Sequence, residues 1–235
     1  TMASIKDMPK SAPEALYELG KSDIKNRAAL YQALMDDQRI NKKAIEILFH
    51  LGYFNKFAQP NRLITEYEIY QKYISVKVLT KSSFDDIMID VIRPCCGKET
   101  EKQFREIDNK ALITALIKQA NIKPTTIVDR IKWQLEYLGY CTVSDPNSDP
   151  NDWLVLDVKT TGYGTVYCTL YNLCYGAERT YRASKKFWTN HQLSKGDVAR
   201  VVLQEKNKMK KDENGEWITL SETYQEMKVW KKLEV

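Results

Sequence analysis

The second half of the chain combines aromatic and basic residues in a pattern that suits binding of single-stranded nucleic acid. In the run 166–171 the aliphatic and cysteine side chains fall on one face of an extended strand, whereas Tyr167 and Tyr171 fall on the other. If the aliphatic face fills a core, both tyrosines point outward, where an aromatic ring can stack on any base. The basic residues that could follow the phosphates are Lys159, Arg182 and Lys185. The alternative is that the tyrosines pack under loops or against another domain. Four further aromatic residues of this half are expected to have packing roles: Trp153, Phe187, Trp188 and Trp217.

A second basic feature is the run 206–211, which contains four lysines and precedes the tight-turn sequence Asn214-Gly215. We expect Lys208 to reach phosphates from a hairpin loop of the kind that small barrels use on nucleic acid. Acidic residues lie next to this run, so a solvated hairpin without a binding role is an equal alternative.

Two predicted helix starts in the first half are further candidates, because the first turn of a helix exposes unpaired N–H groups that attract phosphate. The residues that would contact it are Lys6, Lys10 and Ser11 at the first start and Lys42 and Lys43 at the second. Asn41 is the expected cap of the second helix. The alternative is an ordinary capped start, since Ser11 and Glu14 have the spacing of a capping box.

Motifs for catalysis or for metal and cofactor binding are missing from the sequence. Only two histidines are present, His50 and His191, and there is no P-loop, G-x-G-x-x-G or H-E-x-x-H motif. Asp86 and Asp90 are four residues apart, but a two-metal site requires acidic residues gathered on a rigid scaffold. We therefore expect no catalytic residue, no metal site, no cofactor, and neither polymerase nor nuclease activity.

The composition is that of an ordinary globular protein, with 235 residues, 43% hydrophobic, 29% charged and a net charge of +5. This mildly basic balance permits nucleic-acid binding without requiring it. No apolar run approaches the roughly 18 residues of a membrane span. The five cysteines form no C-x-x-C pair, which predicts reduced thiols. We expect a cytoplasmic protein, monomeric or weakly associated, that makes no membrane contact.

The candidate residues of the first half lie at predicted helix starts, and those of the second half lie mostly on or beside predicted strands. The sequence therefore predicts an α+β protein with two domains. Apolar residues spaced by three and four predict helices over 12–20, 26–36, 41–51, 62–73, 83–92, 100–107, 109–120 and 125–138. A turn-rich stretch at 145–152 separates this helical domain, 1–144, from a strand-rich domain, 145–235. Strands are predicted over 153–160, 165–173, 178–184, 197–205 and 216–221. Five strands with one interruption favour an OB-fold β-barrel over an SH3-like barrel.

Several segments, taken in order, resemble the C-terminal region of the α subunit of bacterial or phage DNA polymerase III. The segments 4–19 and 41–55 resemble its two helix-hairpin-helix elements, and Asn61-Arg62 matches a motif that follows them. The stretch 135–140 resembles the sequence before that family's OB domain. The OB strands themselves are matched by 171–173, 184–188 and 195–198. No single motif is specific, and it is the shared order along nearly the whole chain that makes the resemblance.

The resemblance implies a tandem helix-hairpin-helix domain that contacts duplex DNA, followed by an OB domain near the single-stranded template. It also implies part of a DNA-directed DNA polymerase, without the catalytic palm. One departure is Asp7-Met8-Pro9, where the family has Gly-Ile-Gly, because Pro9 lacks the N–H that would hold a phosphate. The expected partners are duplex and single-stranded DNA, with a sliding clamp and other replisome proteins as further candidates.

The alternative function is a protein-interaction adaptor that binds a sliding clamp or another replication protein without touching DNA. The family's clamp-binding peptide has a Gln followed by aliphatic residues and an aromatic. The segments 71–74 and 103–107 match that pattern only poorly.

Overall fold

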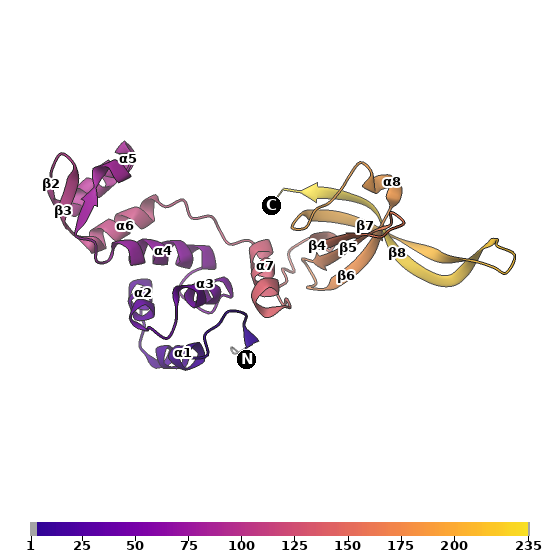
Figure 1. Ribbon diagram of the computed structural model, residues 1–235, viewed down its shortest axis with the longest axis horizontal. Helices are drawn as coiled ribbons and strands as arrows, with labels where there is room; N and C mark the ends of the chain where they lie inside the picture. The colour runs from indigo at the N-terminus through magenta and orange to yellow at the C-terminus, as the bar shows by residue number, and fades with distance from the viewer. Residues whose placement is uncertain (1–3, 235) are drawn as a thin grey trace. The chain divides into compact units, whose positions relative to one another are not determined.

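The computed structural model describes residues 4–234 and has an α+β fold that divides into two compact units, residues 1–140 and 141–235 (Figure 1). Helices make up most of the first unit, and a five-stranded sheet dominates the second. The division therefore falls at Tyr140/Cys141, four residues before the predicted 144/145 boundary. Each unit is described by itself below.

The helical unit is built on amphipathic helices, and four of the six described here begin at a capping side chain. Its main helices are α1 (Ala12–Lys21), α2 (Arg27–Asp36), α3 (Lys42–His50), α4 (Pro60–Tyr73), α6 (Asn109–Gln119) and α7 (Ile127–Leu138). Asn41 accepts a hydrogen bond from the Ala44 N–H, which confirms the predicted cap of α3. Thr126 and Asp129 form a capping box at the start of α7. The expected box at Ser11 is wrong, because the Ser11 side chain makes no capping bond.

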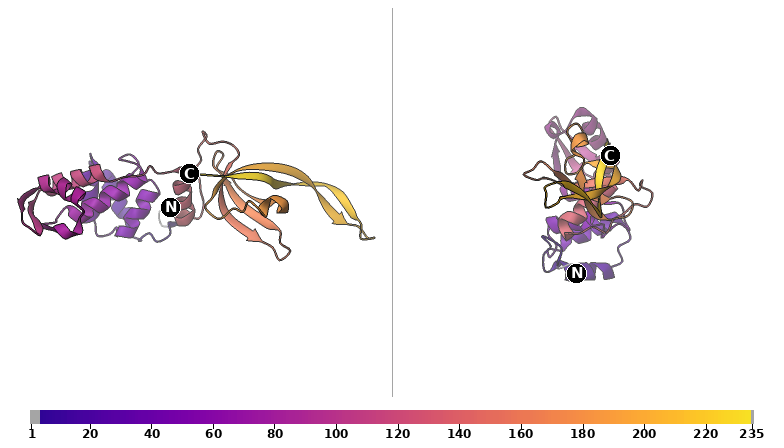
Figure 2. Two further views of the ribbon diagram at one scale, coloured as in Figure 1. Left: turned by 90° about the horizontal axis from the view of Figure 1, so that it is seen from above. Right: turned by 90° about the vertical axis from the view of Figure 1, so that its right-hand side faces the viewer.

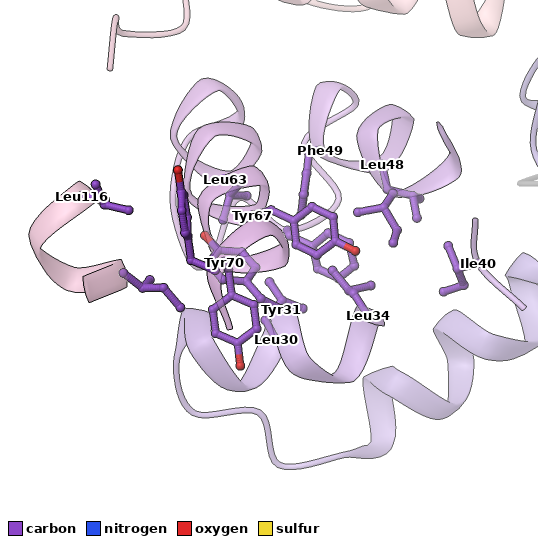
Figure 3. Packing of buried hydrophobic residues seen from close by; sticks show 14 of the residues in the cluster. Leu30, Tyr31, Leu34, Ile40, Leu48, Phe49, Leu63, Tyr67, Tyr70 and Leu116 are labelled. Carbon is purple, nitrogen blue, oxygen red and sulfur yellow. The ribbon is translucent and has the colours of Figure 1, made fainter. Parts of the chain in front are cut away.

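The core of this unit is unusually aromatic (Figure 3). Tyr31 from α2 packs against Tyr67 and Tyr70 from α4, with ring centroids 5.7 Å apart in both pairs. Phe49 from α3 meets Tyr67 edge-on, also at 5.7 Å. Such tilted and edge-to-face pairs add to the stabilisation from area burial. The core therefore joins α2, α3 and α4.

A small sheet that the sequence did not predict lies between α4 and α6 in the chain. Its strands are β1 (Val78–Thr80), β2 (Cys96–Glu99) and β3 (Gln103–Ile107), and they pair in the order β1-β3-β2. Three short elements separate β1 from β2 in the chain: the 3-10 turn η2 (Lys81–Ser83), the helix α5 (Asp86–Ile92) and the 3-10 turn η3 (Arg93–Cys95). The helix expected over 100–107 is wrong. That stretch is too short for its apolar spacing to distinguish a helix from a strand, and Phe104 is fully buried in the central strand β3, paired with residues of both neighbouring strands.

In the second unit five strands pair in a closed ring. They are β4 (Asp152–Thr160), β5 (Val166–Asn172), β6 (Glu178–Ala183), β7 (Val198–Lys211) and β8 (Trp217–Leu233), and the order around the ring is β4-β5-β6-β8-β7. All neighbours are antiparallel except β6 and β8, which pair in parallel at Arg182↔Glu226 and Ala183↔Met227. The short helix α8 (Lys185–Trp188) lies between β6 and β7 in the chain. β7 and β8 are both longer than predicted.

The inner face of the barrel is aliphatic at one strand and aromatic at others. Cys168 and Leu170 are fully buried there, as the alternation of β5 predicts. Trp153 and Trp230 are also in the core, and Phe187 and Trp188 pack against it, which confirms the packing role expected for Trp153 and the two α8 aromatics. Beyond the Gln204↔Glu226 pair, β7 and β8 continue as a two-stranded ribbon that projects from the barrel (Figure 2).

His50, at the end of α3, lies in a stack with two aromatic rings of α7. Its ring centroid is 4.2 Å from that of Trp133 and 5.8 Å from that of Tyr137, with interplanar angles of 25° and 12°. The Tyr137 hydroxyl is 3.4 Å from His50 Nδ1. Burial lowers the pKa of His50, against the smaller opposing effect of nearby carboxylates, those of Glu46, Glu136 and Asp129. His50 is thus a packing residue between α3 and α7.

We predict that the helical unit loses stability as the pH falls through the range just below 6.5. A histidine whose pKa is lower in the folded state binds fewer protons there than in the unfolded chain, so acid favours unfolding. Urea unfolding at pH 5.5 and 7.5 measures the difference, and His50→Asn should make it smaller. A variant with the same pH dependence as the parent would show that His50 is not responsible.

The segment 141–151, which contains no regular helix or strand, is the expected site of proteolysis. Segments without regular structure at the boundary of compact units are the preferred sites of proteolysis, because they can open locally without unfolding either core. We predict that limited digestion with a protease of broad specificity, such as subtilisin or proteinase K, gives two resistant fragments with ends near 145–152, because this segment contains no Lys, Arg or Glu for a narrower protease to cut. First cuts within 41–54 or 165–173 would contradict this.

Candidate nucleic-acid interface

A cavity of about 1030 Å³ in the second unit is a groove between β5, β6 and the β7–β8 ribbon. We call it the barrel groove. Three of the predicted site residues line it: Tyr167 from β5, Arg182 from β6 and Lys208 from β7. The structure therefore brings Tyr167 and Lys208, which are 41 positions apart in the sequence, onto one surface.

The barrel groove is positively charged at its lining. Arg182, Lys206 and Lys208 line it, and no Asp or Glu is among the described residues that do so. The buried carboxylate of Glu226 contacts Lys206 Nζ and lies 3.8 Å from Arg182 Nε, and Glu222 pairs with Lys208 at 2.6 Å. These carboxylates hold the three cations in place and also compete with any incoming phosphate. The exposed Lys208–Glu222 pair contributes little to stability and can exchange its partner.

Aromatic side chains at the barrel groove are exposed enough to meet a base. Tyr167 is 40% exposed and Trp217 is 62% exposed. Tyr224 is half-buried, and the Arg182 guanidinium lies 6.0 Å from its ring centroid. The Lys211 ammonium is 5.6 Å from the ring centroid of Trp217. Aromatic rings interleaved with cations are the arrangement that non-specific binders of single strands use.

Trp217 and Tyr224 are residues that sequence reasoning missed. Trp217 was expected to pack, because a tryptophan close to a strand is usually buried. It lies instead in the ribbon beyond the barrel, directly opposite Lys211, where there is no second layer to cover it. The signal in the sequence was its position two residues after Asn214-Gly215, which places it at the tip of a hairpin.

A row of cross-strand neighbours extends from the groove across β4, β5 and β6. Tyr167 pairs in register with Lys159 on one side and with Arg182 on the other. Lys159 is exposed and pairs with Asp157 at 3.2 Å, and it does not line the groove. The alternation predicted for β5 thus places Tyr167 between two cations on the outer face.

Tyr171 corrects the sequence prediction, because it is only 2% exposed and cannot stack on a base. It does lie on the face opposite Leu170, but the chain before β4 covers that end of the strand. The Tyr171 hydroxyl donates a 2.7 Å hydrogen bond to the Val143 carbonyl oxygen. Burial also raises the pKa of Tyr171. Alternation fixes the face of a residue in a strand, and it does not show what lies over that face.

In the helical unit the loop before α1 lies against the start of α3. Lys43 Nζ donates to Asp7 Oδ2 at 2.7 Å, and the ammonium group of Lys43 holds the pKa of Asp7 below its usual value. The Lys6 N–H donates to the Tyr137 carbonyl oxygen. Asp7 therefore occupies the position in which a phosphate would meet Lys43. Lys6, Lys10 and Lys42 remain exposed around this contact.

Ser11 corrects the prediction for the same loop. Its hydroxyl donates a 3.0 Å hydrogen bond to the Arg39 carbonyl oxygen, so its proton is already committed. Ser11 thus fastens the loop before α1 to the turn before α3 and is not free to donate to a phosphate.

Two further sequence candidates fall outside any assembled site. Lys185, at the start of α8, is exposed and does not line the barrel groove. The poor clamp-peptide matches 71–74 and 103–107 lie at the end of α4 and in β3, where Tyr73 and Phe104 are buried. Neither segment can present its aromatic side chain to a partner without unfolding.

The described residues contain no group of three or more His, Cys, Asp or Glu side chains arranged to hold a metal ion. Within the same residues, no helix combines the length and the apolar character that crossing a bilayer requires. Comparisons with protein-family models, with characterised proteins and with solved structures gave no match. The function is therefore argued from the geometry.

Proposed function

We propose that this chain is a non-catalytic DNA-binding accessory region of a replicative DNA polymerase, which holds single-stranded template in the barrel groove and duplex DNA at the helical unit. The barrel groove is the observation that carries the proposal. It brings together Tyr167, Arg182 and Lys208, three residues chosen for stacking and phosphate contact, and adds Trp217. Stacking surfaces combined with cations suit a strand of any sequence.

The strand order supports the proposal that the barrel is an OB-fold rather than an SH3-like barrel. An OB-fold is a five-stranded Greek-key barrel that binds oligonucleotides on its central strands and in its loops. Here the third strand, β6, pairs with the fifth, β8, and α8 lies between the third and fourth, as expected for that topology. The β7–β8 ribbon corresponds to the loop between the last two strands, one of the loops that OB-folds use for binding.

Backbone geometry supports a helix-hairpin-helix role for the start of the chain. Asp7 has a φ of 64°, in the left-handed region, and the resemblance places a glycine of the family at this position. The Met8 N–H bonds to the Ile5 carbonyl oxygen, which closes a turn before α1. Lys6, Lys10 and Lys42 are the cations proposed to meet the duplex backbone.

The test is fluorescence anisotropy of a labelled 12-nucleotide strand, and separately of a duplex, across a salt series. Binding that depends on phosphate contacts must weaken linearly in log–log form as salt rises. We predict that Lys206→Gln with Lys208→Gln reduces the magnitude of the single-strand slope by about 1.4, because each lost phosphate contact accounts for about 0.7. Lys98→Gln with Lys118→Gln, in the helical unit, is the matched control and should leave that slope unchanged.

Duplex binding distinguishes the two units. Lys42→Glu should weaken duplex binding and leave single-strand binding intact. Absence of binding to either DNA at low salt would refute the proposal and favour the adaptor function.

A further inference from the structure

The helical unit contains a cavity of about 620 Å³. Neither of the two proposed DNA-binding surfaces includes it. It lies between α2, the turn after α3, α4 and α6, and we call it the helical cavity. Its volume is within the range of about 300–1,000 Å³ that small-molecule sites occupy.

The inner wall of the helical cavity is apolar and aromatic. Tyr31, Tyr70 and Ile113 line it and are each less than 10% exposed, and Phe57 and Ile117 extend the apolar surface toward solvent. The Tyr70 hydroxyl is engaged with Gln32 Oε1 at 2.9 Å, and the Tyr31 hydroxyl with Glu66. Tyr31 and Tyr70 therefore form the floor of the cavity with their hydroxyl groups engaged, and the partly exposed Phe57, Ile74 and Ile117 provide the apolar surface that a ligand can cover.

The mouth of the helical cavity is cationic. Lys25, Arg27, Lys56 and Lys110 line it, and all but the half-buried Arg27 are exposed. Lys56 and Lys110 have no carboxylate partner among the described residues, and Lys56 Nζ lies 4.8 Å from the Phe57 ring centroid. Lys25 pairs with Asp23, but both side chains are more than three-quarters exposed, so this pair is weak.

Glu66 is the single acidic residue among those that line the cavity, and its charge is compensated. Its side chain is 2% exposed, and its two oxygens accept hydrogen bonds from Arg27 Nε at 2.6 Å, Arg62 Nε at 2.7 Å and the Tyr31 hydroxyl at 3.0 Å. Two guanidinium groups thus face one carboxylate. The net charge of the cavity lining is therefore positive, because Lys56 and Lys110 have no carboxylate partner among the described residues.

We propose that the helical cavity binds a nucleoside monophosphate, with the base on the apolar wall and the phosphate between Lys56 and Lys110. A flat aromatic base matches the partly exposed Phe57, Ile74 and Ile117, and a doubly charged phosphate matches two lysines that have no carboxylate partner among the described residues. Inorganic phosphate would leave the apolar wall unused, and an uncharged nucleoside would leave the lysines unused.

The test is isothermal titration of the full chain with AMP at low salt. Lys56→Glu with Lys110→Glu is expected to weaken AMP binding at least tenfold. Lys98→Glu with Lys102→Glu, at two exposed residues of the small sheet region that do not line the cavity, makes the same change in net charge and is expected to have little effect. Circular dichroism verifies that both variants fold. Adenosine and inorganic phosphate should each bind at least tenfold more weakly than AMP.

Amide shifts in a ¹⁵N spectrum locate the ligand, and they should centre on Thr114 and Ile117, which line the cavity. Trp217→Ala, at the barrel groove, should leave AMP binding unchanged, and Thr114→Trp, which fills the cavity, should abolish it. No heat with millimolar AMP, equal losses in the two double variants, equal binding of inorganic phosphate, or shifts centred on the barrel groove would each overturn the proposal.

Discussion

Replacing Tyr167 and Trp217 together by alanine is expected to weaken binding of a short single strand by about 30-fold or more. Both rings are exposed at the barrel groove, and each base stacked on an aromatic side chain is worth about 1–3 kcal/mol. The two losses should add if the rings hold different bases. Anisotropy with a labelled oligonucleotide at fixed salt measures the effect.

The chain offers a matched control for this loss. Tyr163 is 96% exposed and lies in the turn between β4 and β5, outside the groove lining. Tyr163→Ala removes an exposed ring without changing the groove, so it should leave affinity within about twofold. If the double variant keeps its fold and binds as tightly as the parent, the groove is not a stacking surface. Equal losses in the double variant and Tyr163→Ala would point to non-specific aromatic contact.

A second large effect is expected from Phe49→Ala in the helical unit. Phe49 is 1% exposed, and the rings of Phe54 and Tyr67 lie 5.7 Å from it. Truncating a buried phenylalanine costs about 3–5 kcal/mol, which is a large share of the stability of a unit this size. We expect the helical unit to unfold at much lower urea concentration and duplex binding to fall with it.

The barrel provides the internal reference for that experiment. Because the chain divides into two compact units, barrel resonances and single-strand binding should survive under conditions in which the Phe49→Ala helical unit is unfolded. Tyr17→Ala, at a side chain that is 65% exposed, should change stability by less than about 0.5 kcal/mol. Simultaneous loss of the barrel signals would contradict the independence of the two units.

The broad fold was predictable because each half of the chain shows one local signal over a long stretch. Apolar spacing of three and four recurs through most of residues 12–138, and period-two alternation with turn residues recurs after residue 152. The small sheet was not predictable, since its strands have three to five residues and only the tertiary pairing of β3 with both neighbours defines them. The length of β8 was also missed, because the buried residues of its barrel part, Glu226, Met227 and Trp230, do not alternate with period two.

For the candidate site, the sequence identified the correct face of β5 and could not identify what covers it. Tyr167 and Tyr171 have the same parity, yet one is open and the other lies under residue 143 and its neighbours. Similarly, Ser11 was selected for its hydroxyl, and the backbone carbonyl that takes its proton is 28 residues away. Long-range covering groups of this kind leave no local pattern.

The parallel pairing of β6 with β8 has a consequence for the order in which this protein can fold during synthesis. The barrel ring cannot close until residues 226 and 227 have left the ribosome, whereas the last helix of the helical unit ends at Leu138. In the interval β6 is the open edge of an incomplete sheet, a template for pairing with other chains. Its sequence, Glu178-Arg179-Thr180-Tyr181-Arg182-Ala183, has three charged residues in six. Charges on an edge strand discourage pairing with other chains. Arg182 therefore opposes aggregation of the nascent chain through β6, and after the barrel closes it lines the groove.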